Sequence, residues 1–368
     1  MPLVPQSHVP LAPLTTLGLG GPARHFVEAT DQAAVMDALA WAEGARLPVF
    51  VLGGGSNLVV PDAGFAGLVL RVALRGINFS PAVDGQVSLQ VAAGEPWDDV
   101  VAAAVARDLA GIECLSGIPG TAGATPVQNV GAYGQEVAEV ITEVRVYDRQ
   151  LRALATMTSA DCAFSYRHSV FKQQPDRFVV LSVGFQLVPQ GPPALRYAEL
   201  RAALAAGATA GATPSLAEVR QTVLGLRRRK SMVIDPADPN RRSVGSFFTN
   251  PVLGAAQFQS LVSRALGAGL VAQAAELPRF AAGPGSADYK VPAAWLIEKA
   301  GFAKGTRRGP VGISSAHALA LVHHGGGQTA QLLALAREIR AAVVARFGVE
   351  LVPEPVVLGC AAGADPLG

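Results

Sequence analysis

Near the N-terminus, short apolar runs alternate with an amphipathic stretch. Residues 33–41 place apolar side chains on one helical face, whereas 24–29, 48–52 and 67–72 are short segments typical of strands. This alternation of one helix with several strands predicts a small α/β unit.

A second α+β unit is predicted between residues 86 and 188. Residues 86–92 alternate polar and apolar side chains, and 143–148 and 178–188 are further predicted strands. Residues 97–109 are predicted to be helical, with two aspartates in the first turn, where carboxylates favour the helix dipole. We expect the last strand to end at the Pro/Gly-rich linker that follows it.

A third segment begins after this linker and an Ala-rich stretch at 200–213. Residues 215–230 predict a helix that Ser215 can cap and whose apolar residues share one face. Further predicted elements are helices at 256–266, 293–300 and 329–347, the last ended by Gly348, and a strand at 317–322.

Composition narrows the classes of function. The 368 residues are 50% hydrophobic and 16% charged, which is typical of globular rather than disordered chains. The formal net charge of +2 gives no overall electrostatic reason to bind nucleic acid or an anionic membrane. The uncharged stretches 114–135, 178–195 and 243–263 are poor membrane spans, because glycine, proline and polar residues interrupt them. We therefore expect neither nucleic-acid nor membrane partners.

The three cysteines, Cys114, Cys162 and Cys360, are widely spaced in the sequence. They form no C-x-x-C pair and no Cys/His pattern at the spacing of metal ligands. The first residues also lack the basic start and apolar run of a signal peptide. We expect reduced thiols, no metal site and a cytoplasmic protein. We take the chain to be a monomer, although these residues do not bear on its oligomeric state.

Three glycine-rich segments are candidate phosphate sites. The segment Gly18–Ala23 formally fits G-x-G-x-x-G/A, but a predicted strand follows it instead of a helix, so we do not assign it to a dinucleotide. The segment Gly53-Gly-Gly-Ser-Asn-Leu58 directly follows a predicted strand and presents backbone amides beside two polar side chains, which suits a phosphate. It lacks the Gly-Lys-Ser/Thr of a P-loop.

The third segment, residues 115–134, carries no charge and spaces Gly117, Gly120 and Gly123 three apart. A pyrophosphate there would be held by backbone N–H groups rather than by Lys or Arg. For one such loop alone, tight turns that need positive φ are the commoner explanation. Two loops beside consecutive α/β units favour a large nucleotide cofactor.

Ordered motifs run from residue 16 to residue 359. They are Thr16-Leu-Gly-Leu-Gly-Gly-Pro-Ala, Gly53-Gly-Gly-Ser-Asn-Leu, Ile118-Pro-Gly, Gln128-Asn-Val-Gly-Ala-Tyr-Gly, Ser165-Tyr-Arg-His-Ser-Val-Phe-Lys, Gly245-Ser-Phe-Phe-Thr-Asn-Pro, Lys290-Val-Pro-Ala-Ala-Trp-Leu-Ile-Glu and Pro353-Glu-Pro-Val-Val-Leu-Gly. This set resembles the UDP-N-acetylenolpyruvoylglucosamine reductase family of peptidoglycan enzymes, whose flavin domain is of the p-cresol methylhydroxylase type.

The resemblance implies an α+β fold, in which a two-part p-cresol methylhydroxylase-type FAD-binding module precedes a C-terminal α+β substrate-binding domain. We assign residues 1–75 and 76–214 to the two FAD subdomains, the second with a substrate tyrosine loop. Residues 215–350 are assigned to the substrate domain, and 351–368 to a C-terminal strand with a catalytic glutamate. The implied FAD contacts are Gly53, Gly54, Gly55, Ser56, Asn57, Leu58, Pro119, Gly120, Gly123, Ala124, Thr125, Asn129, Gly131 and Ala132.

The implied reaction reduces an enolpyruvyl ether to a lactyl ether, with NADPH reducing FAD and the flavin passing hydride to the vinyl carbon of UDP-N-acetylglucosamine enolpyruvate. The resulting carbanion beside a carboxylate needs a fixed cation, an acid and a proton donor. The resemblance assigns these roles to Arg167, Glu354 and Ser246, respectively. From spacing alone, a surface salt bridge is the leading explanation for Arg167; the alternatives for Glu354 and Ser246 are an exposed strand-end carboxylate and a helix cap.

Substrate contacts are implied for five further residues. Tyr133 and Asn250 match contacts to the sugar diphosphate, and Tyr197 matches the mobile loop that defines the tyrosine-loop subclass. Lys230, which follows three arginines at a predicted helix end, matches a lysine near the substrate or NADPH phosphates, although a solvated helix end is an equal alternative. Tyr166 precedes the implied catalytic arginine and completes the set.

Two other functions remain open on the sequence. An oxidase or dehydrogenase of the same flavin superfamily would keep the glycine loops, but it gives no reason for Arg167, Ser246 and Glu354 to stand in three separate motifs. A sugar-nucleotide-binding scaffold without catalytic activity would keep the fold, and the presence of all three residues argues against it. We expect FAD to lie between the first two domains, with the third closing over the substrate.

Overall fold

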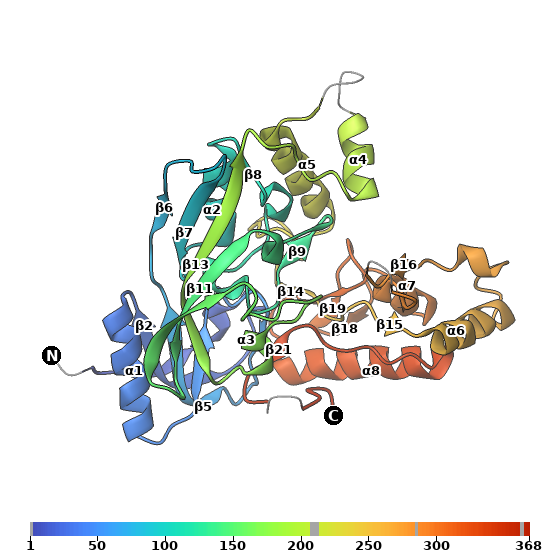
Figure 1. The fold of residues 1–368 in the computed structure, drawn as a ribbon. Helices are drawn as coiled ribbons and strands as arrows, with labels where there is room; N and C mark the ends of the chain where they lie inside the picture. The colour runs from blue at the N-terminus through green and yellow to red at the C-terminus, as the bar shows by residue number, and fades with distance from the viewer. Residues whose placement is uncertain (1–2, 207–212, 284–285, 361–363) are drawn as a thin grey trace. The chain divides into compact units, whose positions relative to one another are not determined.

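The chain in the computed structural model divides into two compact units, each built from separate stretches of sequence (Figure 1). Unit 1 comprises Met1–Pro10, Pro22–Gly55 and Gly64–Ile234, and unit 2 comprises Leu11–Gly21, Ser56–Ala63 and Asp235–Gly368. The structure describes residues 3–206, 213–283, 286–360 and 364–368, so residues 207–212 of the predicted Ala-rich stretch lie outside it.

Unit 1 begins with a four-stranded sheet in the order β1-β2-β5-β3. Strands β2, β5 and β3 are parallel, so their carboxyl ends meet at one edge, whereas β1 is antiparallel to β2. The elements are β1 (Gln6–Pro10), β2 (Pro22–Ala29), α1 (Gln32–Gly44), β3 (Val49–Leu52) and β5 (Phe65–Val72). The predicted α/β unit is therefore confirmed. Strand β2 begins at Pro22, so the segment Gly18–Ala23 leads into a strand and not into the helix that a dinucleotide turn needs.

The second sheet of unit 1 has the order β12-β11-β13-β7-β6, with β8 paired to β13. The buried rings of Trp97 in α2 and Phe185 in β13 lie 5.6 Å apart in the core that this sheet shares with the first. The elements are β6 (Ile77–Phe79), β7 (Val87–Ala92), α2 (Trp97–Val105), β8 (Leu109–Ala110), β11 (Ile141–Asp148), β12 (Ala153–Thr158), α3 (Val170–Gln173) and β13 (Phe178–Pro189).

The predicted helix 97–109 is too long. Helix α2 ends at Val105, because Asp108 adopts a left-handed φ of 53° and the chain then enters β8. The two aspartates in its first turn, Asp98 and Asp99, are as expected.

Unit 1 also contains a pair of helices after its second sheet and several short elements between β8 and β11. Helix α4 (Ala198–Ala205) packs on α5 (Leu216–Arg229). Ser215 caps α5 as the sequence predicts, and Glu218 completes a capping box that was not predicted. The remaining short elements of the unit are η2 (Glu113–Leu115), η3 (Ala122–Ala124), β9 (Gly131–Ala132), β10 (Gln135–Glu136) and η4 (Val137–Glu139).

Unit 2 contains a sheet in the order β14-β20-β19-β18 and a three-stranded sheet in the order β15-β17-β16. Its long helix α8 ends at Gly348, whose φ of 68° is the left-handed conformation expected of a glycine cap. Strand β21 pairs with β4, which brings the segment Ser56–Ala63 into this unit.

The elements of unit 2 are η1 (Ala12–Leu14), β4 (Leu58–Val59), β14 (Ser243–Ser246), β15 (Val252–Leu253), α6 (Ala255–Gly267), η5 (Ala274–Glu276), β16 (Phe280–Ala281), β17 (Tyr289–Lys290), α7 (Ala293–Lys299), β18 (Arg307–Arg308), β19 (Val311–Ile313), β20 (Ala320–His323), α8 (Thr329–Phe347) and β21 (Val356–Val357). The strand predicted at 317–322 starts late, because the Ala320 amide donates to the His317 carbonyl in a turn.

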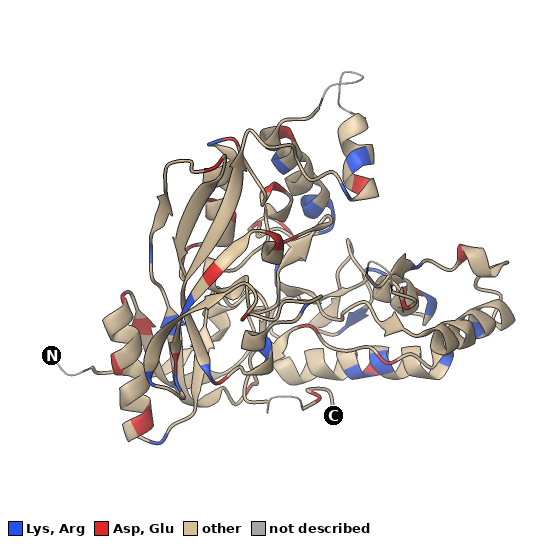
Figure 2. Cartoon of the chain, in the orientation of Figure 1, with Lys and Arg blue, Asp and Glu red and all other residues tan. Residues whose placement is uncertain are grey.

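Charged residues are interspersed over both units (Figure 2). This distribution fits the small net charge of the sequence. The four segments predicted as functional domains cut the chain differently from the two compact units, and that division stays a prediction.

Candidate active site

Two glycine segments of unit 1 pack against each other without room for side chains. A Cβ atom on Gly54 would lie 2.7 Å from Cα of Gly120, and one on Gly53 would lie 2.9 Å from Oγ1 of Thr121. The second segment bends at Gly120, whose φ of 122° suits glycine. The sequence predicted both segments as cofactor loops, and the structure brings them together.

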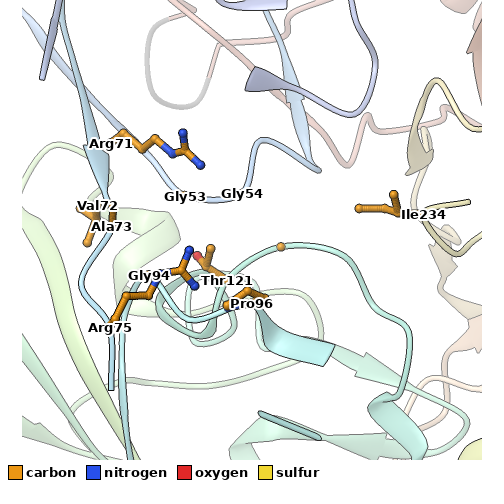
Figure 3. Close-up of a pocket in the computed structure, with 11 residues that line it drawn as sticks. Gly53, Gly54, Arg71, Val72, Ala73, Arg75, Gly94, Pro96, Thr121 and Ile234 are labelled. Carbon is orange, nitrogen blue, oxygen red and sulfur yellow. The ribbon is translucent and has the colours of Figure 1, made fainter. Parts of the chain in front are cut away.

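A cavity of about 190 Å³ opens beside this contact, lined by Gly53, Gly54, Gly120 and Thr121 and by two arginines, Arg71 and Arg75 (Figure 3). Its volume is below the roughly 300–1,000 Å³ of a whole-ligand pocket, so it suits one part of a dinucleotide. Glycine amides and guanidinium groups are the donors that bind phosphates, so these residues fit FAD.

The predicted FAD residues differ in how their backbone amides are used. The amides of Gly123, Ala124 and Thr125 donate to Ala93, Thr121 and Ala122, respectively, so they are not free to hold a phosphate. No described residue accepts a hydrogen bond from the amides of Gly53, Gly54 or Gly120. The remaining predicted contacts lie in the loop of Pro119, in β9 (Gly131 and Ala132), in the positive-φ turn at Gly55 and, in unit 2, at Ser56, Asn57 and Leu58.

Arg167 stands in a tight turn of unit 1. Ser165 and His168 exchange backbone hydrogen bonds of 3.1 Å, and Arg167 between them has a left-handed φ of 54°. Its guanidinium donates to the carbonyl oxygens of Gly131 (2.9 Å) and Asn129 (3.4 Å) and lies 5.6 Å from the ring centre of Tyr166. A left-handed conformation in a non-glycine residue costs energy and is frequent at functional sites.

The buried side chain of Asn129 joins this turn to the glycine loop. Its amide group donates to the Ser165 carbonyl (3.1 Å) and to Glu136 (2.7 Å), and its oxygen accepts from the Ala138 amide. Asn129, a predicted cofactor residue, therefore uses its side chain for hydrogen bonds within the protein. Its side chain holds the turn at Ser165, and its backbone carbonyl accepts from the Arg167 guanidinium.

Tyr133, Tyr197 and Lys230 gather in unit 1, although they are far apart in the sequence. Tyr133 lies at the tip of the β9–β10 hairpin, and its ring meets that of Tyr197 edge-on at 5.5 Å. The Lys230 ammonium lies 5.9 Å from the Tyr133 ring centre and pairs with Glu199 at 2.6 Å. Burial raises the pKa of Tyr133 to about 12, so its phenol stays protonated and can donate to a phosphate or sugar oxygen.

In unit 2, β-type pairing brings Ser246 and Glu354 to adjacent backbone positions. Phe247, which follows Ser246, accepts a 2.9 Å hydrogen bond from the Glu354 amide, and the bridge continues between Phe248 and Pro353. The side chain of Asn57 donates to the Glu354 carbonyl at 3.3 Å. The pairing thus brings together Ser246, Glu354 and the predicted cofactor residue Asn57, which lie in three segments that are distant in the sequence.

The environment of Ser246 is apolar on one side. Phe247 and Phe248 are almost fully buried, with rings 5.2 Å apart, and Ser246 itself is half-buried at the end of β14. Asn250 beyond them accepts from the Ala293 amide at 2.9 Å, so its oxygen holds the start of α7 while its amide nitrogen keeps donors for a ligand.

The comparisons with known proteins agree with this geometry. Residues 236–358 match the model of the UDP-N-acetylenolpyruvoylglucosamine reductase C-terminal domain, and residues 23–150 match that of an FAD binding domain. The UDP-N-acetylenolpyruvoylglucosamine reductase of Streptomyces coelicolor is 52% identical over 354 residues, which cover 96% of this chain and 90% of that protein. The chain belongs to the UDP-N-acetylenolpyruvoylglucosamine reductase family.

A second relative and a solved structure support the family fold. The reductase of Thermobifida fusca is 49% identical over 357 residues, covering 96% of this chain and 97% of its own. The crystal structure of the Thermus caldophilus enzyme superposes with a TM-score of 0.65 at 23% identity, covering 96% of this chain and 99% of its own. The predicted α+β fold with its FAD module and C-terminal domain is confirmed.

Sequence reasoning missed three residues that the structure places at the site. Arg71 and Arg75 line the cavity, and the buried Glu113 accepts from Ala194 (2.7 Å), Gly111 (2.8 Å) and Gln135 (3.3 Å). Glu113 thus fixes the base of the tyrosine loop next to the Tyr133 hairpin. In the sequence, Glu113 could have been noticed as the single carboxylate that directly precedes the uncharged stretch 114–135.

Within the described ranges, no helix is long and apolar enough to cross a membrane. The same part of the chain holds no group of three or more His, Cys, Asp and Glu side chains arranged to bind a metal ion.

Proposed function

We propose that this chain reduces UDP-N-acetylglucosamine enolpyruvate to UDP-N-acetylmuramate in peptidoglycan precursor synthesis, using FAD and NADPH. The observation that carries the proposal is 52% identity to a UDP-N-acetylenolpyruvoylglucosamine reductase over 96% of this chain. The aligned residues span both the FAD-binding and the C-terminal regions. The Gly53–Gly54 and Gly120–Thr121 loops would hold FAD, which would supply the hydride chemistry that links NADPH to the vinyl carbon of the substrate.

Arg167 acts as the fixed cation for the substrate carboxylate. Hydrogen bonds to Gly131 and Asn129 hold its guanidinium, and the tight Ser165–His168 turn leaves its side chain little freedom to reorient. A preorganised cation stabilises the negative charge that develops beside the carboxylate when hydride arrives.

Ser246 donates the proton that completes the reduction, and Glu354 supports the charged intermediate. The buried phenylalanine pair after Ser246 limits water on that side, which strengthens the interactions of a hydroxyl with developing charge. The hydrogen bonds from Glu354 to Phe247 and from Asn57 to Glu354 fix the backbone that carries the carboxyl group.

Tyr133, Tyr197 and Lys230 bind the sugar diphosphate, with Tyr166 and Asn250 as further contacts. The cluster offers two phenol donors and an ammonium group, and these suit phosphate oxygens. The position of Tyr197 before α4 supports assignment to the tyrosine-loop subclass.

We further propose that the protein acts as a cytoplasmic monomer on small molecules, without nucleic-acid or membrane partners. The free thiols of Cys114, Cys162 and the exposed Cys360 support a reducing compartment.

The proposal is tested by incubating purified protein with NADPH and UDP-N-acetylglucosamine enolpyruvate and identifying the product by mass spectrometry. We expect NADPH oxidation that depends on the enolpyruvyl compound and a product heavier by two hydrogens. NADPH oxidation that proceeds equally without this compound, with oxygen as the acceptor, would instead indicate an oxidase.

A further inference from the structure

We propose that Arg71 and Arg75 bind the diphosphate of FAD. This role rests on the proposed flavoenzyme function. From the sequence, only backbone amides were expected to bind the diphosphate. Both side chains line the cavity beside the Gly53–Gly54 loop, and Figure 3 shows their guanidinium groups directed into it.

The position of Arg71 follows from the topology of the first sheet. Its Cα pairs with Leu52 of the neighbouring parallel strand, and Leu52 directly precedes Gly53. Arg71 therefore lies at the carboxyl edge of β2, β3 and β5, and this is the edge at which open parallel sheets bind nucleotides. Arg75 follows on the connection that leaves β5.

Each arginine is anchored by a carboxylate that leaves donors for a ligand. Arg71 pairs with Glu28 at 2.9 Å, and Arg75 with Glu95 at 3.4 Å, in each case through one terminal nitrogen. A guanidinium has five N–H donors, so the others can reach an anion. Glu95 also accepts from the Gly76 amide at 2.5 Å, which fixes the connection that carries Arg75.

The neighbouring backbone completes a phosphate site. The amides of Gly53, Gly54 and Gly120 have no acceptor among the described residues, and the loops pack too closely for any side chain to intervene. Two cations beside uncommitted amides match the charge and the acceptor oxygens of a diphosphate.

FAD, NADPH and the UDP-sugar all contain a diphosphate, and the location favours FAD. Apart from Ile234, the residues that line the cavity fall between 53 and 121, inside the 23–150 match to an FAD binding domain. The match to the reductase C-terminal domain begins only at residue 236.

The test measures how fast the purified holoenzyme releases FAD, followed by flavin fluorescence at increasing NaCl concentration. We expect Arg71→Met and Arg75→Met each to release FAD about 10- to 100-fold faster, the factor for loss of one charge-assisted hydrogen bond. The KM values for NADPH and for the enolpyruvyl substrate, measured with excess FAD, should stay unchanged.

Matched variants separate ligand binding from a structural role. Glu28→Gln and Glu95→Gln weaken the same ion pairs but keep the cations, so they should not accelerate release. Arg152→Met, at an exposed ion pair with Glu43 outside the cavity, should behave like the parent chain. If a methionine variant misfolds by circular dichroism, Arg71→Lys and Arg75→Lys replace it, with smaller effects in the same direction.

Three results would overturn the inference. They are unchanged FAD release in both arginine variants, equally fast release in the glutamine variants, and a raised KM for NADPH or the enolpyruvyl substrate with unchanged FAD release. A parent chain that cannot be loaded with FAD at all would instead contradict the proposed function.

Discussion

The two units hold their predicted site residues in different ways. In unit 1, Arg167 and Tyr133 each sit at the tip of a two-residue turn with left-handed φ, 54° and 51°, closed by hydrogen bonds between residues close in sequence. In unit 2, Ser246 and Glu354 become neighbours only through pairing between segments distant in the chain.

This difference indicates where each unit is sensitive to change. The turns of unit 1 are closed locally, although the Arg167 guanidinium also needs the carbonyls of Gly131 and Asn129. A long-range pairing depends on the packing of every segment that takes part, here Asn57, Phe247 and Glu354. Variants at the two kinds of site should therefore differ in how far the damage extends beyond catalysis.

The largest effect is expected on the unit 2 side, from Ser246→Ala. Removing the proton donor should lower kcat by about 10²- to 10⁴-fold, the usual contribution of general acid catalysis. Reduction of the flavin by NADPH should continue at the parent rate, because this step does not use the hydroxyl. Rapid mixing measures both steps, with Ser263→Ala, at an exposed position of α6, as the control. If Ser246→Ala carried out both steps at the rates of the parent chain, the role would be refuted.

On the unit 1 side, Arg167→Ala should lower kcat by about 10²- to 10³-fold through loss of the fixed cation. FAD should remain bound, because Arg167 is not among the residues that line the cavity beside the glycine loops. The visible spectrum of the purified variant and its turnover check both points against Arg152→Ala. Loss of the flavin together with activity would mean that Arg167 serves the cofactor.

Glu113→Ala sharpens the comparison, because Glu113 joins segments of unit 1 that lie 81 residues apart in the sequence, as the pairing in unit 2 joins distant segments. Each buried donor left without a partner costs about 1–3 kcal/mol, so the free energy of unfolding should fall and the substrate KM should rise as the tyrosine loop loosens. Denaturant unfolding and steady-state kinetics measure these, with the exposed Glu43→Ala as control. Unchanged stability would show that the contacts of Glu113 are dispensable.

Tyr197→Phe should have a smaller effect, raising the substrate KM about 2- to 10-fold through loss of one hydroxyl hydrogen bond. The edge-on ring contact with Tyr133 should survive, so kcat should change little. Steady-state kinetics at saturating NADPH test this, and an unchanged KM would count against the tyrosine-loop assignment.

The smallest effect concerns pH. Because burial raises the pKa of Tyr133 to about 12, the folded chain keeps this proton after the unfolded chain has lost it, near pH 10. The stabilisation from Tyr133 is thus complete below about pH 10 and is lost as the pH rises toward 12. Unfolding of Tyr133→Phe should show a shallower loss of stability across that window, and identical curves would exclude the effect.

Regular elements were predictable where a long stretch of sequence carries one period. The capped helix α5 and the long helix α8 have the expected bounds within a residue, because a cap at Ser215 and a glycine at Gly348 mark their ends. Strands of two residues, such as β15 and β16, hold too little pattern to be seen. Residue types alone also did not show that the left-handed Asp108 would end α2.

The site was predictable in its motifs but not in its supporting contacts. The Gly53 and Gly120 loops could be matched to a cofactor, yet the sequence could not show which of their amides the fold already uses. Arg71 in a strand resembles any solvent-facing arginine until its pairing with Leu52 places it beside the loop. The assignments of Arg167, Ser246 and Glu354 stay predictions that the variants above test.

The most direct test of the account is an anaerobic titration of the purified holoenzyme followed by visible absorbance. NADPH should bleach the flavin, and UDP-N-acetylglucosamine enolpyruvate added next should restore the colour in proportion to the amount added. A flavin that bleaches but stays bleached after the enolpyruvyl compound is added would contradict the account, because the chain would then lack the substrate half of the reaction.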